Sequence, residues 1–178
     1  RARIEIEPRR TQWTLRSVRL LQSAVAAGGR AHARCEIQSW RGERREVEMT
    51  VNVPEELPDG GYVLYFGGGA ELSRYEAQRL PSRYRPTSLG DAWRRLGEQR
   101  PSGALYAALF ASAPEVTLRG EDYPELPISA LALLASPHAG GESGRRGDAA
   151  RFDERRLALE GPLRGEVLLA LRVERTAR

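Results

Sequence analysis

Few residues of this chain have the side chains that nucleophilic or metal chemistry requires. All 28 basic residues are Arg, so no lysine can form a Schiff base or bind nucleotide phosphates in a P-loop. The single cysteine, Cys35, and the two histidines, His32 and His138, are too few for a Cys/His zinc site. These counts argue against lysine-, cysteine- and zinc-dependent enzymes.

The local context of these residues favours structural roles. Cys35 lies on the apolar side of an alternating segment, where a small core residue is a simpler interpretation than a reactive thiol. His32 lies on the opposite side, and His138 lies in a glycine-rich stretch. Neither histidine has an acid and a nucleophile at recognisable spacing, so we interpret both as surface residues.

Two glycine-containing segments have only a partial likeness to catalytic or cofactor-binding motifs. Gly67–Gly69 lies between a predicted strand and a predicted helix, as phosphate loops do, but Gly-x-Gly-x-x-Gly and Lys-Ser/Thr are missing. We interpret it as a plain turn. Gly141–Gly144 fails the Gly-x-Ser-x-Gly pattern because Arg145 stands two residues after Ser143.

Acidic residues offer the remaining chemistry. Glu55, Glu56 and Asp59, and separately Glu121 and Asp122, could provide oxygen ligands to calcium, but neither group follows the EF-hand order. We therefore predict no metal, no cofactor and no catalytic residue. Chemistry by two facing carboxylates stays open, because the chain has 24 acidic residues whose arrangement the sequence does not define.

The positive charge is concentrated near the N-terminus. The net charge is +4, and Arg1–Arg45 contains 11 Arg against 4 acidic residues. Arginine recognises phosphate well, so an Arg-rich nucleic-acid-binding domain is an alternative function. These arginines alternate with apolar residues and are not interleaved with aromatic side chains, which favours a solvated sheet face and no nucleic-acid partner.

Alternating apolar and polar residues predict strands in the first part of the chain. Residues 30–40 alternate, and Val47, Met49, Val51 and Val53 share one face that we expect to be buried. Residues 15–25 are ambiguous, because their apolar positions also fit a helix. We predict a mainly β protein, with an immunoglobulin-like antiparallel β-sandwich over residues 1–66.

Residues 67–178 are predicted to form a small appended α/β subdomain. Ser88 is a candidate N-cap, and Leu89, Ala92, Trp93 and Leu96 follow helical spacing. We expect a helix near residues 88–98, packed on strands that begin at Leu105 and Val167. Trp13 and Trp93 are both expected in the core, whereas Trp40 borders a turn and is expected to be partly exposed. Further expectations are a strand pair at 104–111 and 115–118, a loop at 136–150 and closing strands at 152–159 and 167–173. No apolar run approaches the roughly 20 residues of a membrane span.

The order of strands and turns resembles a known family. Glu7–Val18 precedes Val25–Gly29, and a strand then leads to the turn Trp40-Arg-Gly-Glu and a further strand ending at Val53-Pro54. Later matches are Pro86–Leu89, Leu105–Phe110, Leu126–Ser129 and Gly165–Val173. This pattern resembles the region that follows the peptidase domain in bacterial envelope proteins with a sporulation stage IV B (SpoIVB-type) serine peptidase domain.

The resemblance implies a function without catalysis. The family's peptidase domain is not present in these residues, and none of the matching positions is catalytic in the family. The resemblance implies a non-catalytic, extracytoplasmic (periplasmic or cell-envelope) binding or structural module that docks on a larger envelope-associated protein complex. A fragment of a serine peptidase whose catalytic domain lies elsewhere is the other alternative.

We predict the contact with this protein partner in the segment after Gly67. Tyr and Arg are enriched at the energetic centres of protein interfaces. The predicted interface residues are Arg74, Arg79, Arg83, Tyr84 and Arg85. The competing interpretation is that Tyr75 and Tyr84 attach this segment to its own domain.

Overall fold

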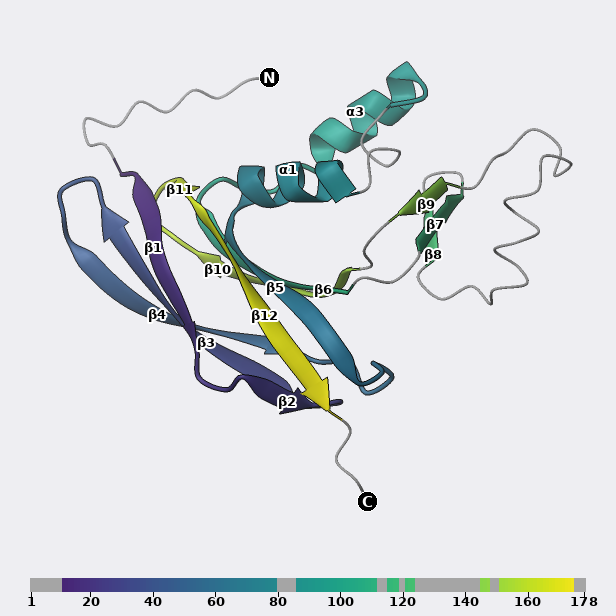
Figure 1. Ribbon diagram of the computed structural model, residues 1–178. Helices are drawn as coiled ribbons and strands as arrows, with labels where there is room; N and C mark the ends of the chain where they lie inside the picture. The colour runs from purple at the N-terminus through teal and green to yellow at the C-terminus, as the bar shows by residue number, and fades with distance from the viewer. Residues whose placement is uncertain are drawn as a thin grey trace, which may run out of the picture.

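The computed structural model describes residues 11–79, 86–111, 115–118, 121–123, 145–147 and 151–174 (Figure 1). The chain is mainly β, with two curled sheets whose strands are largely antiparallel. The predicted fold class is confirmed at this level. No helix in the described part of the chain is long and apolar enough to cross a membrane.

The first sheet has the strand order β11-β1-β3-β4. Its strands are β1 (Trp13–Leu20), β3 (Arg30–Ser39), β4 (Arg44–Asn52) and β11 (Leu163–Arg164). The alternation expected in β4 is confirmed, because Met49 and Val51 are buried while Glu48 on the other face is exposed. The segment 15–25, which was ambiguous between strand and helix, is a strand up to Leu20. Its backbone pairs with β3 there and does not form the local hydrogen bonds of a helix.

The second sheet has the order β10-β6-β5-β12-β2. Its strands are β2 (Ala24–Ala26), β5 (Gly60–Gly68), β6 (Ala104–Ala111), β10 (Arg151–Ala158) and β12 (Glu166–Glu174). Central strand β5 is covered on both faces. Leu64 and Phe66 face the first sheet, whereas Tyr65 belongs to a second apolar cluster on the opposite face. This double burial explains why residues 62–66 are almost continuously apolar.

The main hydrophobic cluster lies between the two sheets and draws on the whole chain. Trp13, Val51 and Leu64 from the first part meet Leu105 and Leu171 from the second. Residues from both segments, 1–66 and 67–178, therefore share one core among the described residues. Trp13 is buried there, as expected, whereas Trp40 is 61% exposed.

Two helices lie outside the second sheet. Helix α1 (Gly69–Arg79) covers the outer face of β5 and β6, where its Leu72 packs in the second cluster with Tyr65 and Phe110. Helix α3 (Leu89–Gly97) lies on the side of α1 away from the sheets (Figure 1). A small third sheet has the order β8-β7-β9, formed by β7 (Glu115–Leu118), β8 (Glu121–Tyr123) and β9 (Arg145–Gly147).

Several expectations for the second part were wrong. The predicted helix exists as α3, but none of its residues is buried and Trp93 is exposed, because α1 already occupies the sheet face that α3 would need. The predicted pairing of 104–111 with 115–118 is also wrong, since β6 pairs with β5 and β10, while β7 pairs with β8 and β9. The loop expected at 136–150 contains strand β9.

Candidate functional site

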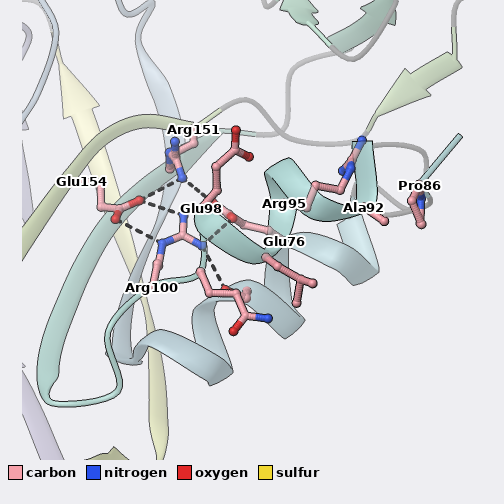
Figure 2. A pocket seen from close by; sticks show the side chains of 11 residues that line it. Glu76, Pro86, Ala92, Arg95, Glu98, Arg100, Arg151 and Glu154 are labelled. Atoms are coloured by element: carbon pink, nitrogen blue, oxygen red, sulfur yellow. Dashed lines mark hydrogen bonds and ion pairs between the residues drawn. The ribbon is translucent and has the colours of Figure 1, made fainter. Parts of the chain in front are cut away.

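A cavity of about 750 Å³ lies between α1, α3 and the edge strand β10 (Figure 2). Helix α1 contributes Ser73 and Glu76 to its wall, and β10 contributes Arg151 and Glu154. The remaining lining residues come from α3 and its two flanks: Pro86, Ala92, Arg95, Leu96, Glu98, Gln99 and Arg100. Its volume falls within the range of about 300–1,000 Å³ that is typical of small-molecule sites.

Four charged side chains form a cluster in the wall of this cavity (Figure 2): Glu76, Arg100, Arg151 and Glu154. Arg100 donates to both oxygens of Glu76, with Nη1–Oε2 at 2.9 Å and Nη2–Oε1 at 3.0 Å. It also donates to both oxygens of Glu154, with Nε–Oε1 at 3.1 Å and Nη2–Oε2 at 2.9 Å. A fifth bond joins Nη1 to Ser73 Oγ at 3.2 Å, so all five N–H groups of this guanidinium have acceptors.

Arg151 completes the cluster from the other side. Its Nη1 lies 2.6 Å from Glu76 Oε1 and 2.8 Å from Glu154 Oε2, so two cations balance two anions. Burial would lower the pKa of Arg100, but the hydrogen bonds and charges of Glu154 and Glu76 outweigh it and raise that pKa. Arg100 therefore stays charged, and a ligand could bind it only by displacing one of its present partners.

The local structure explains how residues so far apart in sequence meet. Ser73 and Glu76 are three residues apart on α1, which places them on one helix face. Arg151 and Glu154 are also three apart, but on a strand, where this spacing normally puts side chains on opposite faces. A register shift between Arg151 and Asp153 reverses the alternation, so Glu154 reaches Arg100 and Arg151 reaches Glu76.

The chemistry available in the cavity is limited. Ser73 Oγ donates to the Gly69 carbonyl oxygen at 2.9 Å and accepts from Arg100, so no base activates it. Both glutamates of the cluster are engaged by arginine. Among the cavity-lining residues that the structure describes, no nucleophile is paired with a base. The arrangement is suited to joining three elements, namely α1, β10 and the segment after α3.

Helix α3, on the rim of the cavity, is stabilised by its own residues. The N-cap Ser88 Oγ accepts from the Asp91 amide at 3.1 Å, and the Asp91 carboxylate accepts from the Thr87 amide at 3.1 Å. Asp91 Oδ1 also lies 2.8 Å from Arg94 Nη2 and 3.0 Å from Arg95 Nε. The hydrogen bond from Arg95, followed by that from the Thr87 amide, lowers the pKa of Asp91. These contacts allow the helix to form without packing on a core.

The apolar face of α3 is open to solvent. Leu89 is 86% exposed, Trp93 76% and Leu96 58%. We call these three residues the α3 face. Isolated exposed apolar residues are ordinary, whereas contiguous exposed apolar patches are typical of interaction sites. The sequence pattern revealed this row but not its exposure, since an amphipathic helix in a small domain usually packs on the core.

The predicted interface residues have different environments. Arg74 is exposed on α1, whereas the half-buried Arg79 guanidinium lies 5.0 Å from the centre of the Tyr75 ring and 5.9 Å from that of Phe110. Arg83, Tyr84 and Arg85 lie outside the described residues. The Tyr75 ring packs on Tyr65 and Phe110, with centroids 5.2 and 5.1 Å apart. An interface at the five predicted residues stays a prediction.

Other residues considered from the sequence belong to the scaffold. Cys35 is fully buried, as expected for a core residue, and burial raises the pKa of its thiol to about 12. His32 lies beside Thr50, with its Nδ1 3.1 Å from Thr50 Oγ1, and His138 lies outside the described residues. His32 is therefore paired with a hydroxyl of the neighbouring strand β4.

Of the remaining motifs, Gly67 and Gly68 belong to the scaffold, whereas Glu55, Glu56 and Asp59 are exposed on the loop between β4 and β5. Gly67 and Gly68 are not the predicted turn, because they continue β5 and pair with β6. A Cβ at Gly68 would lie 2.5 Å from the Leu163 carbonyl oxygen, which explains the glycine there. Within the described residues, no three His, Cys, Asp or Glu side chains could hold a metal ion.

Comparison of the chain with protein-family models, with curated proteins and with solved structures found no match. The functional conclusion below therefore depends on the geometry of the cavity and of α3. The sequence resemblance to the envelope family is carried forward as part of that proposal.

Proposed function

We propose that this chain is a non-catalytic protein-binding module that docks through the α3 face on a partner protein of a larger complex. The exposure of Leu89, Trp93 and Leu96 carries the proposal. Their positions correspond to i, i+4 and i+7, the spacing by which an amphipathic helix enters an apolar groove of its partner. Tryptophan is also among the residues enriched at energetic centres of interfaces.

The size of α3 favours a groove on a different protein over a second copy of this chain. Nine residues of helix are about 14 Å long. A stable interface needs about 800 Å² from each partner, which is more than two such short helices lying side by side can bury. A groove can cover the α3 face together with the cavity rim beside it. The partner we propose therefore has an apolar groove that accepts one helix.

The scaffold supports a docking role. Its two sheets enclose one core, and we propose that they form an immunoglobulin-like sandwich that presents α3 at one end. In such scaffolds, function usually lies outside the packed sheets. On the basis of the sequence resemblance to the envelope family, we propose that this module acts in the periplasm or cell envelope, as an accessory part of an envelope-associated complex.

The test begins with a photo-reactive residue in place of Leu89, in cells of the native organism. The protein cross-linked there is identified, purified and titrated with the wild-type chain and with two tryptophan variants. Trp93→Ala should weaken binding about 30-fold, the loss expected at an energetic centre of an interface. Trp40→Ala is the matched control, because Trp40 is also exposed but lies on the β3–β4 turn.

The outcomes separate the alternatives. Equal affinities of the wild type and Trp93→Ala would overturn the proposal. Cross-linking to a second copy, with dimerisation that depends on Trp93, would contradict the choice of a different protein as partner. Binding that Trp40→Ala weakens as much as Trp93→Ala would assign the contact to another surface.

A further inference from the structure

The orientation of α3 requires an explanation, because packing does not provide one. Most helices in proteins are held by burying an apolar face. Helix α3 buries none of its residues, and its cap and ion pairs lie mainly within the helix and its N-terminal flank. Those local contacts make the segment helical, but they do not determine where the helix points.

Arg100 lies three residues after the end of α3. Its side chain connects this end of the helix to the body of the protein, which α3 does not contact through buried residues of its own. The five hydrogen bonds of Arg100 lead to Ser73 and Glu76 on α1 and to Glu154 on β10. Both elements are fixed to the body of the protein, α1 through the fully buried Leu72 and β10 through its pairing with β6. Arg100 thus joins the C-terminal end of α3 to two rigid elements.

The charged cluster does not tolerate a partial withdrawal of Arg100 from its partners. Glu76 is only 3% exposed, so any movement that withdraws Arg100 leaves this carboxylate with fewer of its partners and little access to water. A buried charge without its partners is strongly unfavourable, whereas the complete network is satisfied. The chain after α3 is therefore held in one position as long as the cluster is intact.

We infer that Arg100 is a positioning residue for α3, which it holds in one orientation by bonding to α1 and β10. This inference rests on the proposed function in one respect, the docking role of α3; the mechanical link does not depend on it. With Arg100 in place, the α3 face has a fixed direction beside the cavity. Without it, α3 stays helical but samples several orientations while the β core is unchanged.

Distances between two spin labels test this link without any partner. One label replaces Leu89 on α3, and the other replaces the exposed Arg172 on β12. The native Cys35 is fully buried and does not compete for the reagent. The distance distribution is compared between the double-cysteine protein and the same protein carrying Arg100→Lys, Arg100→Met or Arg94→Met.

Lysine keeps the charge but cannot form five hydrogen bonds in a planar fork. The distribution should become about twofold wider in Arg100→Lys and Arg100→Met, with unchanged hydrogen exchange in β5 and β6, because α3 then samples several orientations. Arg94→Met removes an exposed ion pair on α3 and should leave the distribution narrow. If Arg100→Met does not fold, the width of the distance distribution in Arg100→Lys alone tests the inference.

A narrow distribution in folded Arg100→Lys would overturn the inference, and so would equal widening in Arg94→Met. Failure of the docking proposal is recognised separately, by unchanged partner affinity of Trp93→Ala with these distances as expected.

Discussion

The two helices in the described part of the chain are similar in length but are held by different forces. Helix α1 follows β5 directly and buries Leu72 and Glu76 against the second sheet. Helix α3 has a capped N-terminus and internal ion pairs, and buries no residue. The comparison shows that signals of helix formation and signals of helix burial are separate. A cap and helical spacing predict a helix, but only the competition for a free sheet face decides whether it packs.

The largest expected difference between the helices concerns their charged residues. Glu76→Ala removes a carboxylate that Arg100 and Arg151 both contact, and it should lower the free energy of unfolding by about 3–5 kcal/mol. Glu98→Ala, next to α3, removes an exposed partner 3.8 Å from Arg94 and should change it by at most about 0.5 kcal/mol. Urea unfolding measures the free energy of unfolding of both variants. Equal losses in Glu76→Ala and Glu98→Ala would contradict the claim that the two helices are held by different forces.

Leucine substitutions sharpen the comparison for apolar contacts. Leu72→Ala empties a fully buried position on α1 and should cost about 2–5 kcal/mol. Leu96→Ala on the exposed face of α3 should stay within about 0.5 kcal/mol. The same urea titration serves as the measurement. A loss at Leu96 close to that at Leu72 would show that the α3 face is covered in the free protein.

The cap of α3 should have a smaller, local effect. Ser88→Ala removes the acceptor of the Asp91 amide and should destabilise this helix by about 0.5–2 kcal/mol. Hydrogen exchange should accelerate within residues 89–97 and stay unchanged in α1. Equal acceleration in both helices would mean that they unfold together.

The smallest expected effect is a dependence of α3 on pH. The folded-state pKa of Asp91 is lowered, chiefly by Arg95, so its ionised form stabilises the folded state. This contribution is present above the ordinary carboxyl pKa and is lost as the pH falls through the lowered value. Exchange in α3 should therefore accelerate in acid, and Asp91→Asn should remove that acid dependence. Persistence of the same dependence in Asp91→Asn would contradict the assignment.

The sequence predicted those parts of the fold that depend on local pattern. Alternation placed Met49 and Val51 inside, and the Ser88 cap located the start of α3. The four-residue cluster could not be predicted, because Glu76, Arg100 and Glu154 are separated by many residues and meet through tertiary structure. The strand spacing of Arg151 and Glu154 argues against a shared face, and only the register shift in β10 brings them together.

The exposure of Trp93 could not be predicted either. Its spacing with Leu89 and Leu96 is the same whether the face meets a core or a partner. Trp93 is exposed because α1, which follows β5 directly, covers the outer face of β5 and β6. The sequence therefore predicted a mainly β chain and the existence of α3, but it placed that helix against the sheets.

Fluorescence quenching of Trp93 tests the central claim most directly. In Trp40→Phe two tryptophans remain, and Trp93 is the exposed one, since Trp13 is buried. The account predicts that acrylamide quenches this tryptophan readily in the free protein, and that adding the cross-linked partner shields it and shifts its emission to the blue. A tryptophan already shielded in the free protein, or one equally quenched with and without the partner, would contradict docking through the α3 face.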